Sequence, residues 1–163
     1  MRILGIDPGL ATIGYGVIET NGCHVKVVDY GVITTPKDEN TAVRLAMIDE
    51  AAEALIKKFN PDVVAMEELF FNTNVTTGIK VAMARGVLLV AAVKHCGELY
   101  EYTPLQIKQA MVGYGRADKK QVQEMVKVYL KLEQIPKPDD AADALAVALT
   151  HAQTGKLADN FRI

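Results

Sequence analysis

The sequence predicts an α/β domain with a mixed sheet, and three observations support this fold class. Residues from about 2 to 35 have the pattern of three strands joined by short links, and such links imply antiparallel pairing. The remainder alternates strand-like and helix-like segments, which is typical of strands connected by helices. Half of the 163 residues are hydrophobic and 23% are charged, as in globular proteins. A chain of this size most simply forms one domain, residues 1–163.

Turn signals bound the first three expected strands. Asp7 is followed at once by Pro8-Gly9, which ends the first strand. Asn21-Gly22 is a strong hairpin signal, because both residues tolerate positive φ. The first strand is therefore expected to end at Asp7, the second to run through residues 16–19, and the third to span residues 24–30 and continue to Thr34.

Helical periodicity alternates with two further strands in the rest of the chain. Apolar residues recur at helical spacing from about Thr41 to Phe59, and Asn60-Pro61 stops that helix. Asp118 and Gln121 have the spacing of a capping box at the start of another helix. The expected strands are residues 63–67 and 99–102; the expected helices are about 41–59, 75–94, a short one from Pro104, one from the cap at Asp118 to about Lys131, and about 139–154.

The segment from about Val75 to Lys94 is apolar on nearly every side of its helical axis. Such a helix must be buried on nearly every side. In so small a domain the sheet can cover one face, so a second subunit is expected to cover the rest. The alternative is a central helix sandwiched within one subunit. Lys80, Arg85 and Lys94 interrupt the apolar run and argue against a transmembrane span.

Several features indicate a cytoplasmic protein. The N-terminus enters a strand immediately, which leaves no room for a signal peptide. Cys23 and Cys96 lack the spacing of metal ligands and are expected to be buried thiols rather than a disulfide.

Positive charge is concentrated in one segment although the net charge is −2. Residues 108–131 carry a formal charge of +4, which leaves −6 for the rest of the chain. Local field rather than net charge governs phosphate binding, so this segment could bind nucleic acid. A solvated helix face is the alternative. The basic residues of the segment are Lys108, Arg116, Lys119, Lys120, Lys127 and Lys131.

Four acidic residues stand where a metal-dependent nuclease needs them. Asp7 and Glu67 each close an apolar run, where a buried strand emerges at the sheet edge. Asp140 and Asp143 lie three residues apart in a helix-forming stretch and therefore share one helix face. Clustered carboxylates repel one another, and divalent cations such as Mg²⁺ or Mn²⁺ are the usual compensation.

Each of these assignments has an alternative in the sequence itself. Asp7 could be a simple turn residue, because Asp-Pro-Gly is common turn chemistry. Glu68 should point to the opposite face from Glu67 if the strand continues. Asp139 also lies one helical turn from Asp143, so helix geometry does not exclude it, although it suits an N-terminal cap.

Four motifs in one order make the chain resemble the RuvC family of Holliday junction resolvases. The opening Gly5-Ile6-Asp7-Pro8-Gly9 through Gly14-Tyr15-Gly16 resembles the first motif of that family. The other matching stretches are Met66-Glu67-Glu68-Leu69-Phe70-Phe71, Ala84-Arg85-Gly86-Val87 and Asp140-Ala141-Ala142-Asp143-Ala144-Leu145, with further similarity at Glu101-Tyr102-Thr103-Pro104 and Lys108-Gln109.

The resemblance implies a ribonuclease H-like fold with a mixed five-stranded sheet flanked by helices. In this fold the first and fourth strands are neighbours and the last helix packs beside them. The resemblance selects Asp7, Glu67, Asp140 and Asp143 as catalytic metal ligands, with two Mg²⁺ ions per active site and Mn²⁺ as a substitute. It thereby prefers Asp140 to Asp139.

The resemblance also implies the substrate and the partners. A homodimer would resolve four-way DNA junctions by paired nicks in strands of like polarity, in homologous recombination and DNA repair, together with a RuvA–RuvB-like branch-migration complex. Lys108 and Lys119 match basic residues that contact DNA near the scissile phosphate, and Arg116 and Lys120 are neighbours without comparable support. Phe70 is the expected base contact with Phe71 as a helper, the alternative being that one or both rings belong to the core.

Two other functions compete with this interpretation. A sugar-kinase or actin-type ATPase also begins with Asp-x-Gly after a strand, but it needs a second phosphate-loop aspartate in a duplicated domain, for which this chain is too short. A non-catalytic junction-binding protein on the same scaffold should lack some of the acidic positions, and all four are present here.

Overall fold

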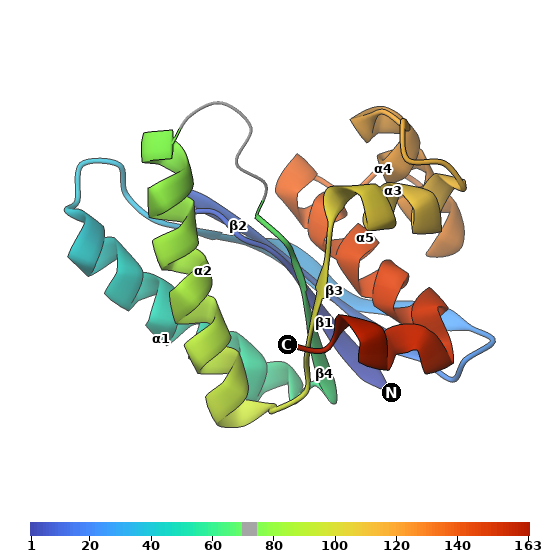
Figure 1. Ribbon diagram of the computed structural model, residues 1–163, viewed down its shortest axis with the longest axis horizontal. Coiled ribbons are helices and arrows are strands. Elements are labelled where there is room, and N and C mark those ends of the chain that lie inside the picture. Colours follow the sequence, from blue (N-terminus) through green and yellow to red (C-terminus); the bar gives the residue numbers. More distant parts are fainter. Residues whose placement is uncertain (70–74) are drawn as a thin grey trace.

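Five strands form one sheet in the order β3-β2-β1-β4-β5 (Figure 1). β1 (Arg2–Asp7), β2 (Thr12–Thr20) and β3 (Val25–Thr34) pair antiparallel, whereas β4 (Val63–Glu67) and β5 (Leu99–Tyr102) continue the sheet parallel to β1. The mixed five-stranded sheet predicted from the sequence is confirmed. The computed structural model describes residues 1–69 and 75–163.

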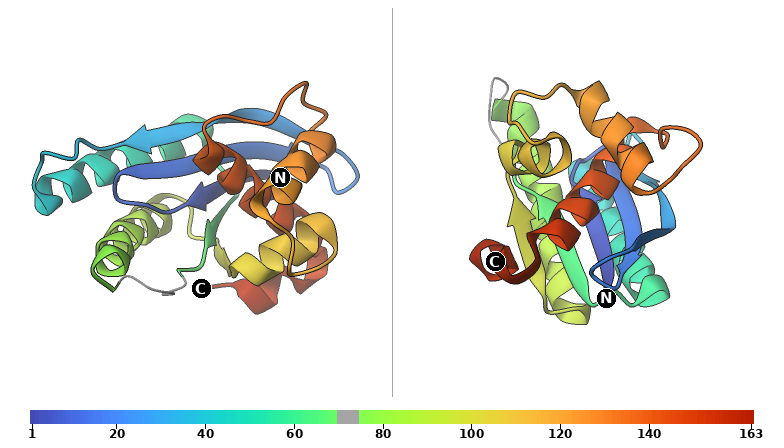
Figure 2. Two further views of the ribbon diagram at one scale, coloured as in Figure 1. Left: turned by 90° about the horizontal axis from the view of Figure 1, so that it is seen from above. Right: turned by 90° about the vertical axis from the view of Figure 1, so that its right-hand side faces the viewer.

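Helices cover both faces of the sheet (Figures 1 and 2). One face carries α1 and α2, and the other carries α5 with α3, α4 and a terminal 3-10 helix beside it. An apolar core lies on each side of the sheet. The helices are α1 (Thr41–Phe59), α2 (Val75–His95), α3 (Pro104–Val112), α4 (Lys119–Tyr129), α5 (Asp139–Thr154) and η1 (Gly155–Phe161).

Helix starts follow the capping chemistry of the sequence, with one correction. Asp118 caps α4 and forms the expected capping box with Gln121. The N-cap of α5 is Pro138, not Asp139. Pro138 already has the extended backbone of a cap residue, so Asp139 becomes the first helical residue, and its carboxylate pairs with Lys137 at 2.6 Å.

The β2–β3 hairpin is confirmed, but its turn differs from the expected one. Gly22 has a positive φ of 90°, whereas Asn21 does not. Asn21 instead uses its side-chain oxygen, which accepts hydrogen bonds from the backbone N–H groups of Cys23 and His24. Cys23 is therefore exposed at the turn, and the prediction that it is buried is wrong. Cys96 is partly buried, and both thiols are free.

Three glycines let α5 lie directly on the sheet. A Cβ on Gly5 would lie 2.1 Å from the carbonyl oxygen of Ala144, and one on Gly14 would lie 1.9 Å from that of Asp140. A Cβ on Gly16 would lie 2.7 Å from the Leu145 side chain. No real contact is this short, so β1 and β2 need glycine wherever α5 crosses them.

One face of α2 is buried and the other is exposed. Its inner residues Ala84, Leu88, Ala91 and Ala92 share a core with α1 and the sheet. The outer stripe remains exposed, so the alternative of a helix sandwiched within one subunit is wrong. By length and composition alone, Thr76–His95 could cross a membrane, and only 22% of it is buried. The large apolar side chains of the exposed stripe are Ile79, Met83, Val90 and Val93.

Candidate active site

Asp7 and Glu67 are lateral neighbours at the same end of the sheet. Ile6 pairs with Met66 across the parallel β1–β4 ladder, and Asp7 and Glu67 are the next residues on the two strands. Side chains alternate along a strand, and Ala65 belongs to the core on the α5 side. Glu67 therefore shares that side with Ala65, and Asp7 shares it with Glu67. Glu68 follows the last residue of β4.

The first turn of α5 brings the other two carboxylates to the same place. Gly14 is the cross-strand partner of Asp7, and it touches the backbone of Asp140. The contact fixes the start of α5 beside the end of β1. Asp140 and Asp143, three residues apart, share one face of the helix. This role of Gly14 was missed by sequence reasoning, although a glycine inside a strand is a signal of close backbone approach.

Burial and mutual repulsion perturb the carboxyl groups strongly. Burial raises the pKa of Asp7 to about 8, with further contributions from the charges of Glu67, Asp143 and Asp140. The carboxyl group of Glu67 lies close enough to that of Asp7 to raise the pKa of Asp7 further. Burial also raises the pKa of Glu67. The cluster holds more negative charge than its surroundings balance.

Lys119 supplies part of the missing positive charge. Its Nζ lies 2.6 Å from Oδ2 of Asp143, and Lys119 begins α4 directly beside α5. Burial lowers the pKa of Lys119, but the hydrogen bond to Asp143 and its charge outweigh burial and raise the pKa overall. The pKa of Asp143 is raised by burial despite this contact. One lysine therefore does not neutralise the cluster.

A small pocket of about 200 Å³ opens beside the carboxylates. Glu67 and Asp143 line it together with Lys108 and Lys119. Acidic oxygens and two cations around one hollow suit a phosphodiester, because the lysines can hold phosphate oxygens beside metal ligands. The apolar part of the lining is Pro104, Ile107, Val122 and Ala146, residues to which sequence reasoning gave no role.

The remaining predicted DNA contacts are distributed differently. Arg116 and Lys120 are exposed near the start of α4 and do not line this pocket. Phe70 and Phe71 lie outside the described residues. Arg85 of α2 forms an ion pair with Glu101 of β5, so it stabilises the packing of α2.

The donor set suits a hard divalent cation. Among residues 1–69 and 75–163, no three His, Cys, Asp or Glu side chains converge tightly enough to hold a metal as they stand. Glu67, Asp140 and Asp143 nevertheless lie near enough to Asp7 for their charges to raise its pKa, after the effect of burial. Lys119 is a counter-charge to Asp143. Carboxylate oxygens are the ligands that Mg²⁺ and Mn²⁺ prefer. A bound cation would relieve the repulsion that raises the pKa of Asp7.

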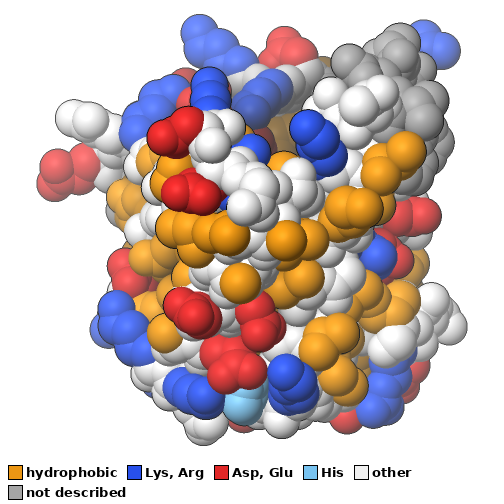
Figure 3. Space-filling model, turned by 90° about the vertical axis from the view of Figure 1, so that its left-hand side faces the viewer, with side chains coloured by type: hydrophobic (Ala, Val, Ile, Leu, Met, Phe, Trp, Pro, Cys, Tyr) orange, Lys and Arg blue, Asp and Glu red, His pale blue; other side chains and the backbone are white. Residues whose placement is uncertain are grey.

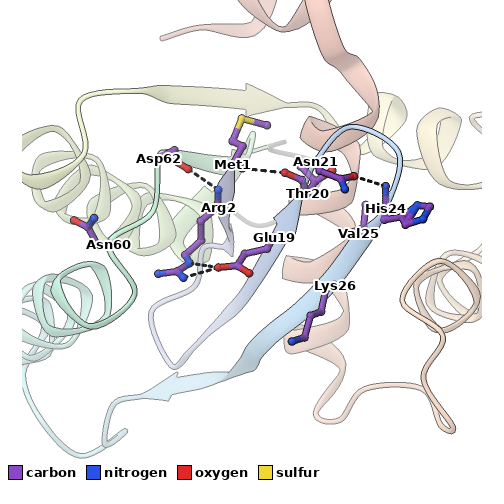
Figure 4. A pocket seen from close by; sticks show the side chains of 10 residues that line it. All are labelled: Met1, Arg2, Glu19, Thr20, Asn21, His24, Val25, Lys26, Asn60 and Asp62. Carbon is purple, nitrogen blue, oxygen red and sulfur yellow. Dashed lines mark hydrogen bonds and ion pairs between the residues drawn. The ribbon is translucent and has the colours of Figure 1, made fainter.

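Other polar groups of the chain are engaged elsewhere. His151 is buried, its Nδ1 lies 2.8 Å from the hydroxyl of Tyr102, and burial lowers its pKa to about 4. A wider hollow of about 500 Å³ lies at the opposite end of the sheet (Figure 4). Its charged groups bond to each other, because Arg2 pairs with Glu19 at 2.5 Å and its backbone N–H donates to Asp62 at 2.6 Å.

Comparison with known proteins agrees with this geometry. The family model described as "Crossover junction endodeoxyribonuclease RuvC" matches residues 3–151. Proteins of that name from Alkaliphilus oremlandii and Alkaliphilus metalliredigens are 57% and 56% identical, each over all of this chain and 99% of the relative.

A solved structure extends the comparison to three dimensions. The structure described as "T. thermophilus RuvC in complex with Holliday junction substrate" superimposes with a TM-score of 0.90 at 34% identity, covering 100% of both chains. The expected ribonuclease H-like fold is thereby confirmed. The chain belongs to the RuvC family of crossover junction endodeoxyribonucleases.

Proposed function

We propose that this protein is a metal-dependent endonuclease that resolves four-way DNA junctions by paired nicks in strands of like polarity. The observation that carries the proposal is the meeting of Asp7, Glu67, Asp140 and Asp143 at one end of the sheet, next to Lys108 and Lys119. Membership of the RuvC family supports the substrate, since a relative is described in complex with a Holliday junction. The whole chain, residues 1–163, acts as one nuclease domain.

The proposed chemistry divides between the four carboxylates and the two lysines. The carboxylates would hold two Mg²⁺ ions, for which Mn²⁺ can substitute, and such ions activate a water molecule and stabilise the leaving oxygen. Lys108 and Lys119 would bind the non-bridging oxygens of the scissile phosphate. The water oxygen bonds to phosphorus and the P–O3′ bond breaks, which leaves 5′-phosphate and 3′-hydroxyl ends.

The decisive experiment compares neighbouring carboxylates on a synthetic four-way junction. Asp7→Asn and Asp140→Asn should abolish cleavage in Mg²⁺ and leave junction binding largely intact, because the basic residues remain. Asp139→Asn is the matched control: Asp139 lies next to Asp140 but pairs with Lys137, so cleavage should persist. Undiminished cleavage by Asp7→Asn would refute the assignment of the site.

Phosphate contacts and base contacts should be separable by salt. Lys119→Ala should weaken junction binding and flatten the log–log dependence of affinity on salt by about 1, because one phosphate contact is lost. Phe70→Ala should leave that slope unchanged and slow cleavage by about 1–3 kcal/mol, because a ring stacks on bases and releases no counterions. Cleavage by Phe70→Ala at the wild-type rate would exclude a wedge role for this ring.

Paired nicks require two active sites, and the exposed face of α2 is the proposed interface of a homodimer. Ile79, Met83, Gly86, Val90 and Val93 follow one another at alternating spacings of four and three residues, which is the pattern of a coiled-coil seam. The four large side chains are 49–60% exposed. Figure 3 shows hydrophobic side chains on the surface of this face of the molecule. A Cβ at Gly86 would meet nothing within 4 Å, so the middle of the seam leaves room for a second helix.

Packing against a second α2 explains the apolar surface better than a membrane does. Arg85 stands within the same helix and pairs with Glu101, and Lys80 and Lys94 flank the seam. A two-fold dimer presents two identical sites to a junction that is itself two-fold symmetric. The protein would act in the cytoplasm, in recombination and DNA repair, alongside a RuvA–RuvB-like branch-migration complex.

A further inference from the structure

A second positively charged pocket, of about 380 Å³, lies at the same end of the molecule as the carboxylates. It is enclosed by the turn that follows β1, the start of α1 and the start of α2. Two of its residues, Arg44 and Lys80, are cationic, and none is acidic. At the upper end of the face in Figure 3, Lys and Arg side chains lie interspersed with Asp and Glu side chains. The lining consists of Gly9, Leu10, Ala11, Thr12, Arg44, Thr76, Thr77, Lys80 and Val81.

The buried guanidinium of Arg44 is the unusual feature of this pocket. Arg44 is 9% exposed, and no carboxylate among the described residues pairs with it. Its Nε donates to the hydroxyl of Thr35 at 2.9 Å, and that hydroxyl donates its own proton to the carbonyl of Leu10 at 2.6 Å. These bonds hold the guanidinium in place but leave its charge unbalanced. Burying a charge without an ionic partner costs desolvation free energy. An anionic ligand beside Arg44 would offset that cost.

The start of α2 adds to this positive field. The first backbone N–H groups of a helix have no partner within the helix, and the helix dipole favours negative charge there. No acidic residue occupies the first turn of α2. Lys80, one turn further along, is exposed and contributes a mobile ammonium group to the same pocket.

We propose that this pocket binds a backbone phosphate of the DNA substrate, at a position distinct from the scissile phosphate. The inference rests on the proposed function and identifies a further contact for the same substrate. Gly9 in the pocket wall is only two residues from Asp7, so their Cα atoms lie within about 7.6 Å. Phosphates of one strand follow one another about every 3.4 Å along a duplex axis. The pocket therefore begins close to Asp7 in the chain, and the phosphate it would bind belongs to the same bound junction as the scissile one.

The test measures junction binding of catalytically inactive protein, carrying Asp7→Asn, at several salt concentrations. Lys80→Gln in this background should flatten the log–log salt dependence by about 1 and weaken binding most at low salt. Arg44→Gln should have the same effect on the salt dependence. Lys26→Gln is the control, because Lys26 lies at the opposite end of the sheet (Figure 4) and should leave the slope unchanged.

Replacing single phosphates by uncharged groups identifies which phosphate the pocket contacts. Junctions in which single phosphodiesters near the cleavage position are replaced by methylphosphonates should weaken binding at one position beyond the scissile phosphate. At that position, Lys80→Gln should cause no additional loss, because the lysine and the charge it binds are removed together. At other positions the two losses should add.

The outcomes separate this inference from the proposed function. Suppose that the wild-type protein cleaves junctions, that Lys80→Gln leaves the salt slope unchanged, and that the losses add at every methylphosphonate position. This result would refute phosphate binding by the pocket and leave the proposed function intact. Wild-type protein that neither binds nor cleaves junctions would overturn the proposed function and this inference with it. Lys80 is exposed, so its variant decides the question even if Arg44→Gln fails to fold.

Discussion

At the scale of single residues, the carboxyl groups of the candidate site lie in an environment that disfavours their ionised forms. The pKa of Asp7 is about 8 because burial and three neighbouring carboxylates disfavour its ionised form. A carboxyl group must be ionised to bind a metal ion, so Asp7, as the proposed ligand, lies in an environment that opposes the form it would need. Burial likewise raises the pKa of Glu67 and of Asp143. Such conflict is expected where a cluster is shaped by its ligand.

This conflict predicts a characteristic pH dependence in metal-free protein. A carboxyl group whose pKa is raised on folding stabilises the fold below its unfolded pKa of 3.8, and this stabilisation is lost as pH rises toward about 8. In EDTA, Asp7→Asn should therefore melt higher than wild type at pH 8, by at least the roughly 2–4 °C that correspond to 1 kcal/mol in a chain of this size. The difference should shrink at pH 5. Parallel melting curves for the two proteins between these pH values would contradict the assignment.

At the scale of elements, periodicity and turn chemistry predicted the sheet and helices well. Helix Thr41–Phe59 and strand Leu99–Tyr102 have the expected bounds, because Asn60-Pro61 and Pro104 mark the ends of local structure. The β2–β3 turn was harder to predict, because a side-chain hydrogen bond of Asn21 replaced the expected backbone conformation. The 3-10 helix Gly155–Phe161 was not expected from the sequence. The two residues that follow it, Arg162 and Ile163, pair with β5, and such tertiary contacts leave no local pattern in the sequence.

The sequence indicates the carboxylates of the candidate site but not how they come together. Strand endings and helical spacing identify candidate carboxylates, yet only the register of β1 with β4 makes Asp7 and Glu67 neighbours. The family resemblance supplied that convergence in advance. The contact of Gly14 with α5 and the ion pair between Lys119 and Asp143 depend on how elements dock, which no local pattern encodes.

Substitution of Gly14 should therefore reduce cleavage as much as substitution of one of the proposed catalytic carboxylates. Gly14→Ala forces a methyl group into the carbonyl of Asp140, which should destabilise the fold by about 1–3 kcal/mol and displace the start of α5. The variant should keep its far-UV circular dichroism and lose most cleavage activity. Mn²⁺ binding should raise the melting temperature of the wild-type protein, and the variant should lack this rise.

Gly31→Ala is the matched control for this change. Its methyl group would meet only the end of the Tyr15 side chain, at 3.0 Å, so cleavage and the Mn²⁺ effect should remain. Full activity of Gly14→Ala would show that α5 can shift without disturbing the carboxylates.

At the scale of the whole molecule, the two faces of the sheet differ in which residues they expose. The α5 face forms the site, while α1 and α2 cover the other face and carry an exposed apolar surface (Figures 2 and 3). Met47 of α1 is also exposed on this side. This apolar stripe is the surface that the proposed dimer would bury. Both the carboxylates and the start of α2 lie at the same end of the molecule, so pairing of α2 helices would fix the separation of two active sites.

This arrangement predicts that assembly and paired cleavage are lost together. Wild-type protein should sediment as a dimer at micromolar concentration, whereas Val90→Glu buries a charge in the seam and should give a folded monomer. The monomer should nick a four-way junction in one strand at a time, because its two sites are no longer linked. Val128→Glu is the matched control, since Val128 is 61% exposed on α4, outside the seam, and should leave the dimer intact. A wild-type monomer at these concentrations, or a Val90→Glu dimer, would exclude α2 as the interface.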